Sequence, residues 1–426
     1  MWDDEVVEAI FREAELGIAG AQLALARAYS SGSLIKGIQF PTDYEKALHY
    51  YALAADQGNP AALNELALMY EQGKGVSADP NKAREFLVLA ADAGDPFGQR
   101  NLARFFLNGI AIARDVQRAF ELYLASAKQG NQWSQFQVAL MYSKGQGVKR
   151  DEPEASSWLR AAAEQGHARA AFLLARRYFD GQGVERDEDQ GCYYLYQAAD
   201  QGDLDAQGEL ANLFYLGEGG VAKDESKAFD WARKAAEKGH APSMVYVARA
   251  LRDGSGVDPD PSAAVRWYEK LAVLPEQSVH EIGQRDLYSI LSRSICLPDQ
   301  ANIELGVMYL SPKFDVVNAK RGEECLVEAW NEGGWIAAAL ELGKAYLYGY
   351  ALPKSEIIAF EWFKRAYDST IENGLAVFEE EVCGWLAYCY ETGVGAQKDT
   401  QMAFAIYKPG ADRGEQWAQL KLAIYF

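Results

Sequence analysis

The stretch that decides the fold runs from Ala62 to Gly94 and reads ALNELALMYEQGKGVSADPNKAREFLVLAADAG. Ala62, Leu66 and Tyr70 recur every four residues, which is the spacing of one helical face. The GKGV turn interrupts this pattern because glycine adopts positive φ at little cost. Asp79 is then typical of the N-cap of a second helix, and Gly94 is a typical helix terminator. The stretch therefore predicts two helices joined by a glycine-containing turn.

The same pattern recurs along most of the chain. A closing glycine stands at Gly58, Gly94, Gly130, Gly166, Gly202 and Gly239, which gives a period of 36 residues and then one of 37. A residue suited to an N-cap precedes each second helix, at Asp43, Asp79, Asp115, Asp151, Asp187, Asp224, Asp260, Asn318, Ser355 and Asp399. Ten such positions predict about ten helix-turn-helix repeats, because a single helix pair cannot bury its apolar face without stacked neighbours.

The repeat predicts an all-α fold, a right-handed α-solenoid in which residues 1–426 form one domain. We expect an N-terminal cap helix over 1–17, regular repeats over 18–274, an irregular insertion over 275–300 and divergent repeats over 301–426. Within the insertion, the closing glycine is missing and an additional helix is expected. The segment 368–374 also adds several residues before the next repeat begins.

The unit Ala-x-x-x-Leu-Ala-x-x-Tyr-x-x-Gly-x-Gly-Val, followed by Asp-x-x-x-Ala-x-x-Trp/Tyr and Ala-Ala-x-x-Gly, resembles the Sel-one-like repeat family, which is related to the tetratricopeptide repeat. The resemblance is clear over 1–270 and weaker over 300–426. It implies scaffolds, adaptors and signalling or secretion accessories, and rarely enzymes. A secreted branch of the family carries a disulfide in each repeat, whereas this chain has five cysteines at unrelated spacings.

Composition limits the classes of function. The chain has 49% hydrophobic residues, 42 Lys and Arg against 61 Asp and Glu, and a formal charge of −19. This charge disfavours non-specific binding to nucleic acid. The first residues lack a basic n-region, and no run of about 18 apolar residues occurs. We therefore expect a cytoplasmic protein with free thiols and without membrane insertion.

The residues that could carry chemistry do not form a catalytic pattern. His167 and His240 each follow a closing glycine and are predicted to be turn residues. The Gly-x-Gly pairs lack the preceding strand and following Lys-Ser/Thr of a phosphate loop. Cys383 and Cys389 have no nearby partners for a metal site, so buried small side chains are expected. The sequence predicts no enzyme activity, no metal and no cofactor.

One inferred face concentrates arginines and aromatic residues. In a tetratricopeptide-like frame, the positions three, six, ten and thirteen residues after each closing glycine face the concave side. Both residue types are enriched in binding hot spots. Pairing of the arginines with acidic neighbours and burial of the aromatics in the core would equally explain them. The predicted protein-binding residues are Phe97, Arg100, Arg104, Trp133, Phe136, Arg169, Phe172, Arg176, Phe179, Tyr215, Arg249 and Arg252.

These observations favour a non-enzymatic adaptor or regulatory scaffold that binds another protein in its groove. The alternative is an immunity protein that neutralises a cognate toxin or effector, because a negative surface would steer a basic partner toward it. A hydrolase or small-ligand receptor that uses pockets between repeats is the third hypothesis. It has the least support, since the sequence contains no catalytic set.

Overall fold

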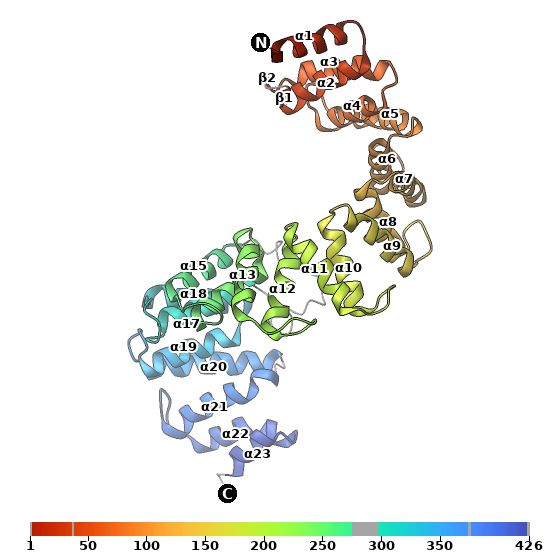
Figure 1. Ribbon diagram of the computed structural model, residues 1–426. Coiled ribbons are helices and arrows are strands. Elements are labelled where there is room, and N and C mark those ends of the chain that lie inside the picture. The colour runs from red at the N-terminus through yellow and green to blue at the C-terminus, as the bar shows by residue number, and fades with distance from the viewer. Residues whose placement is uncertain (1, 36–37, 275–296, 374–375, 424–426) are drawn as a thin grey trace. The chain divides into compact units, whose positions relative to one another are not determined.

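The computed structural model describes residues 2–35, 38–274, 297–373 and 376–423. Within these ranges the chain forms 22 helices and one two-stranded hairpin. Figure 1 shows these elements as ribbons. Contacts divide the chain into two compact units, Met1–Ala206 and Gln207–Phe426. The all-α fold of helix-turn-helix repeats is therefore confirmed, while the expectation of one continuous domain stays a prediction.

The first unit contains paired helices and a short hairpin. Strands β1 (Leu34–Ile35) and β2 (Ile38–Gln39) are antiparallel and lie between the two helices of the first repeat, where no strand was expected. The helices are α1 (Trp2–Glu15), α2 (Ala19–Ser31), α3 (Tyr44–Asp56), α4 (Pro60–Gln72), α5 (Pro80–Asp92), α6 (Pro96–Asn108), α7 (Val116–Lys128), α8 (Gln132–Lys144), α9 (Glu152–Glu164), α10 (Ala168–Asp180) and α11 (Glu188–Asp200). Helix α12 (Leu204–Leu216) begins in this unit and ends in the second.

The second unit continues the helix pairs. Its helices are α13 (Glu225–Glu237), α14 (Ala241–Asp253), α15 (Pro261–Ala272), α17 (Leu297–Leu310), α18 (Ala319–Gly333), α19 (Ile336–Tyr348), α20 (Glu356–Asn373), α21 (Ala376–Thr392), α22 (Thr400–Asp412) and α23 (Gln416–Leu422). The additional helix expected within 275–300 falls mostly outside the described residues. Most of the residues that break the period after Tyr367 lengthen α20, which has 18 residues where most helices have 13.

All ten predicted N-caps accept a hydrogen bond from the first turn of a second helix. Asp79 accepts from the backbone N–H groups of Asn81 and Lys82 at 3.0 and 3.1 Å. Ser355 makes the longest of these bonds, with Oγ 3.4 Å from the nitrogen of Ile358. The other caps are Asp43, Asp115, Asp151, Asp187, Asp224, Asp260, Asn318 and Asp399. The register read from the sequence is therefore correct.

The Gly-x-Gly turns serve packing between repeats. Gly183 has φ +69°, and a Cβ atom there would collide with the carbonyl oxygen of Glu152, the first residue of α9. The second glycine of four other turns lies equally close to the first residue of a preceding second helix, at Gly75, Gly147, Gly256 and Gly395. The Gly-x-Gly pairs are therefore turns between helices, as predicted, and they are also contacts between repeats, because the backbone approach leaves no room for a side chain.

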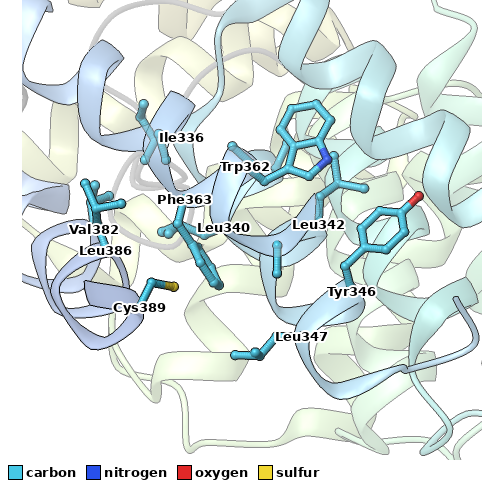
Figure 2. Close-up of a cluster of buried hydrophobic side chains, with 14 of the residues drawn as sticks. Ile336, Leu340, Leu342, Tyr346, Leu347, Trp362, Phe363, Val382, Leu386 and Cys389 are labelled. Atoms are coloured by element: carbon cyan, nitrogen blue, oxygen red, sulfur yellow. The ribbon is translucent and has the colours of Figure 1, made fainter. Parts of the chain in front are cut away.

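Apolar side chains fill the space between paired helices in each unit. In the first unit, one buried cluster includes Leu25, Tyr51 and Leu66. In the second unit, a larger cluster joins α19, α20 and α21, where Figure 2 shows Phe363 among Leu340, Val382 and Leu386. Small residues allow this close packing: a Cβ on Gly343 would overlap the ring of Phe363.

Candidate functional site

The twelve predicted binding residues lie on the first helices of successive repeats. Nine belong to the first unit, on α6, α8 and α10, and three to the second unit, on α12 and α14. The structure brings α8 and the start of α10 together through side-chain contacts. Residues on α6 instead contact α4. These twelve residues, called the stripe below, therefore form several local groups of contacts.

Exposure separates the aromatic members of the stripe. Phe97 and Trp133 are 51% and 54% exposed, whereas Phe136 is half-buried. Phe172 is only 3% exposed, so the expectation that it presents a contact surface is corrected. Two arginines cover its ring, with the guanidinium carbons of Arg169 and Arg176 at 4.8 and 5.9 Å from the ring centroid.

Other aromatic members also pack against neighbouring helices. The ring of Phe179 occupies the space beside Gly191 on α11, where a Cβ atom would overlap it. Tyr215 makes an edge contact with Tyr246, with the ring centroids 5.8 Å apart. These two positions therefore contribute to packing between helices, as the alternative interpretation of the stripe proposed.

Four of the arginines form ion pairs within their own unit. Arg104 Nη2 lies 2.6 Å from a carboxylate oxygen of Glu71, on α4. Other pairs join Arg169 to Asp203 and Asp205, and Arg249 and Arg252 to Glu304 on α17. Each pair links one repeat to the next. These arginines therefore contribute to the contacts between successive repeats.

Arg100 differs from these four. Its guanidinium donates to Oδ1 of Asn101 at 3.1 and 3.3 Å, and Asn101 in turn donates to Oδ1 of buried Asn64 at 2.7 Å. It forms no ion pair within the described ranges. Burial lowers the pKa of Arg100, and the neighbouring Arg104 guanidinium acts in the same direction. The guanidinium held by Asn101 thus lies one turn from the exposed ring of Phe97, and the nearby Glu65 carboxylate acts to raise the pKa of Arg100.

His167 connects α8 to α10. Its Nδ1 accepts a hydrogen bond from the backbone N–H of Ala170 at 3.2 Å, so the residue is the N-cap of α10, where the sequence predicted only a turn residue. The ring lies between Trp133 and Phe136, with both centroid distances 4.5 Å. Burial lowers the pKa of His167. The neutral ring therefore carries its proton on Nε2, which is buried without a partner among the described residues.

A second aromatic group, on α19, on the turn that follows it and on α21, was missed by the sequence analysis. Tyr348, Tyr350 and Tyr388 are exposed and Trp385 is half-buried. Counting positions from a closing glycine did not find these residues, because the additional residues of α20 shift the start of α21 in the sequence. Tyr390 is the equivalent of Tyr70 in the repeat unit. Counting back two residues from Tyr390 would have found Tyr388 in the same slot as Arg104, which lies two residues before Phe106.

The described residues contain no group of three or more His, Cys, Asp and Glu side chains that could hold a metal ion. Cys383 and Cys389 are buried, and burial raises the pKa of each thiol to about 12. Both thiols are therefore protonated small side chains in the core. No helix in the described part of the chain combines the length and apolarity of a membrane span.

Comparisons with known proteins agree with the repeat. The chain is similar to the solved structure of c5321, a protective antigen of uropathogenic Escherichia coli with an SLR fold, at 27% identity and a TM-score of 0.64. That similarity covers 98% of this chain and 90% of the other. A Sel1 repeat protein from Oxalobacter formigenes is 34% identical with a TM-score of 0.51, covering 63% of this chain and 75% of the other.

One curated relative is chitin synthase regulatory factor 3 of Schizosaccharomyces pombe, which is 38% identical over 91 residues. This match covers 21% of the chain and only 9% of the relative's length. The Sel1 repeat itself matches nine segments, at residues 19–59, 60–95, 96–131, 134–167, 168–203, 204–240, 241–272, 336–370 and 382–415. The chain therefore belongs to the Sel1 repeat family.

Proposed function

We propose that this protein is a non-enzymatic adaptor or regulatory scaffold. It binds another protein through the face that the first helices of the repeats form in residues 1–206. Sel1 repeat proteins generally serve as protein-interaction scaffolds. The observation that carries the proposal is Trp133, which is half-exposed while its inner edge is fixed against His167. A large aromatic side chain that is already ordered loses little entropy on binding.

Arg100 and Phe97 supply the polar and apolar parts of the same face. Arg100 is held by Asn101, and its guanidinium carbon lies 5.8 Å from the ring centroid of Phe97. Such a pair offers forked donors beside an exposed ring, a combination common in binding hot spots. The arginines in ion pairs contribute less, because their carboxylate partners already satisfy them.

The regulatory role is favoured over toxin neutralisation. The resemblance to a chitin synthase regulatory factor supports a regulator, although it covers a small part of that protein. The formal charge of −19 supports neutralisation of a basic toxin or effector, which stays the second candidate. We place the protein in the cytoplasm and expect it to act without a cofactor.

Affinity capture from the native cell, followed by mass spectrometry, tests the proposal. The bait proteins are the wild-type chain, Trp133→Ala and the control Tyr193→Ala. Tyr193 is 61% exposed on α11, which is the second helix of its repeat. Its replacement therefore also removes an exposed ring, but away from the proposed face. A partner retained by wild type and Tyr193→Ala but lost with Trp133→Ala supports the proposal. Equal recovery by all three baits would exclude this face.

A further inference from the structure

The second aromatic group forms a continuous surface in the second unit. The ring centroids of Tyr348 and Tyr350 are 5.2 Å apart, and the Trp385 centroid lies 6.2 Å from those of both Tyr348 and Tyr388. Tyr348 is 51% exposed, and the other two tyrosines are exposed as well. Single exposed aromatic residues are normal on a protein surface, whereas four rings in contact, three of them exposed, form a contiguous patch that suggests a binding site.

One face of the Trp385 indole packs against the core. The indole stacks on the buried ring of Phe363, with an interplanar angle of 9° and a centroid distance of 5.2 Å. Phe363 belongs to the core cluster between α19, α20 and α21, where Figure 2 shows its position. The tryptophan is therefore a rigid platform, and a ligand that stacks on it would not have to order the ring.

The charges beside these rings are predominantly negative. Lys344 Nζ pairs with carboxylates of Glu341 and Glu381 at 2.9 and 2.8 Å, which leaves one negative charge in excess in this group. The same Nζ lies 5.9 Å from the ring centroid of Trp385. The chain's own cation thus already approaches an indole flanked by carboxylates, which is favourable because the ring face is negative.

From this arrangement we propose that Tyr348, Trp385, Tyr388 and Glu381 bind an arginine side chain of a basic segment in a partner protein. A guanidinium is planar and stacks on aromatic faces, and it also forms paired hydrogen bonds to a carboxylate. Glu381 has this capacity because Lys344 uses only part of its acceptor sites and half of its side chain is exposed. The formal charge of −19 would attract such a segment over a longer range.

The residues of this surface differ from those of the face proposed in residues 1–206, so either proposal can fail alone. The test uses the full chain labelled with 5-fluorotryptophan and observed by ¹⁹F NMR, with the Trp385 signal assigned from Trp385→Phe. The probe is a Gly-Ser-spaced peptide with two arginines, and the control is the same peptide with citrulline. We expect the Trp385 signal to shift and saturate, with binding about fivefold weaker for citrulline, which lacks the charge.

Two variants on α21 separate recognition from net charge. Glu381→Gln removes the carboxylate that pairs with Lys344 near Trp385, and Glu380→Gln removes one exposed charge from the preceding position. We expect Glu381→Gln, like Tyr388→Ala, to weaken binding about fivefold and Glu380→Gln to leave it nearly unchanged. Equal weakening by both charge variants would overturn the proposal, as would equal citrulline binding or similar shifts at all tryptophans. A Trp385 signal that moves with protein concentration alone would instead indicate self-association and also exclude it.

Discussion

The imidazole of His167 and the indole of Trp133 are in edge contact, with ring centroids 4.5 Å apart. The same imidazole caps α10 through Nδ1. The equivalent cap positions hold Asn59, Asp95 and Asn131, which cap their helices without adding a ring. Histidine at this position therefore combines helix capping with support of the exposed tryptophan.

We expect His167→Ala to lower the free energy of unfolding by about 2 kcal/mol. The loss combines a helix cap with the contacts to two aromatic rings. His240→Ala is the matched control, because His240 occupies the same slot on α14 but its Nδ1 lies 2.8 Å from the Ser243 hydroxyl and does not cap a backbone N–H. Urea denaturation followed by circular dichroism measures both. A loss as large in the control would contradict the role assigned to the His167 cap.

Acidification should destabilise the fold through His167. Burial lowers its pKa in the folded chain below the ordinary value of 6.5, although nearby Asp203 opposes this shift. As pH falls through 6.5 toward the lower folded value, the unfolded chain therefore binds a proton that the folded chain does not. The free energy of unfolding then decreases with falling pH. His167→Asn keeps a cap and removes the titration, so its stability should fall less between pH 7.5 and 5.5; parallel curves would refute this.

The local parts of the fold were predictable from sequence, whereas the exposure of individual side chains was not. A cap such as Asp151 and a turn such as that at Gly183 depend on neighbours in sequence, so spacing suffices. The burial of Phe172 depends on the rotation of α10 about its axis, and one residue of error turns a helical position by about 100°. The pairing of Arg104 with Glu71 joins residues on different repeats, and no local pattern specifies it.

Gly183→Ala should be among the most destabilising glycine substitutions, by about 3 kcal/mol or more. The new Cβ would add a collision with the Glu152 backbone to the strain of positive φ. Gly58→Ala provides the control, because Gly58 has φ +75° and nothing within 4 Å of a Cβ. We expect that change to cost about 1 kcal/mol. Equal losses in urea denaturation would mean that the close approach between repeats contributes nothing.

Asp151→Ala should lower the free energy of unfolding by about 1 kcal/mol, because the backbone N–H of Glu154 loses its acceptor at the start of α9. Asp151→Asn retains an acceptor oxygen and should stay close to wild type. Neither change touches the proposed binding face. An unchanged urea midpoint for the alanine variant would show that this cap does not support its helix.

The binding face is tested by measuring affinity for the captured partner together with thermal unfolding. Trp133→Ala removes an exposed ring, and Arg100→Ala removes a guanidinium without an ion-pair partner in the described ranges. If both are hot spots, each should cost about 2 kcal/mol or more of binding, close to thirtyfold in Kd. Arg104→Ala should also lower the melting temperature, because it breaks the ion pair with Glu71. Part of any loss of affinity in this variant would therefore come from lower stability.

The two readouts distinguish binding from packing. Trp133 contacts His167 on one side and solvent on the other, so its loss should lower the melting temperature slightly and the affinity strongly. Tyr193→Ala, on a second helix, should change neither appreciably. A large melting loss with unchanged affinity would show that Trp133 serves only the contact between α8 and α10. Full affinity in both Trp133→Ala and Arg100→Ala would remove these residues from the interface, because hot-spot residues cannot be truncated without loss.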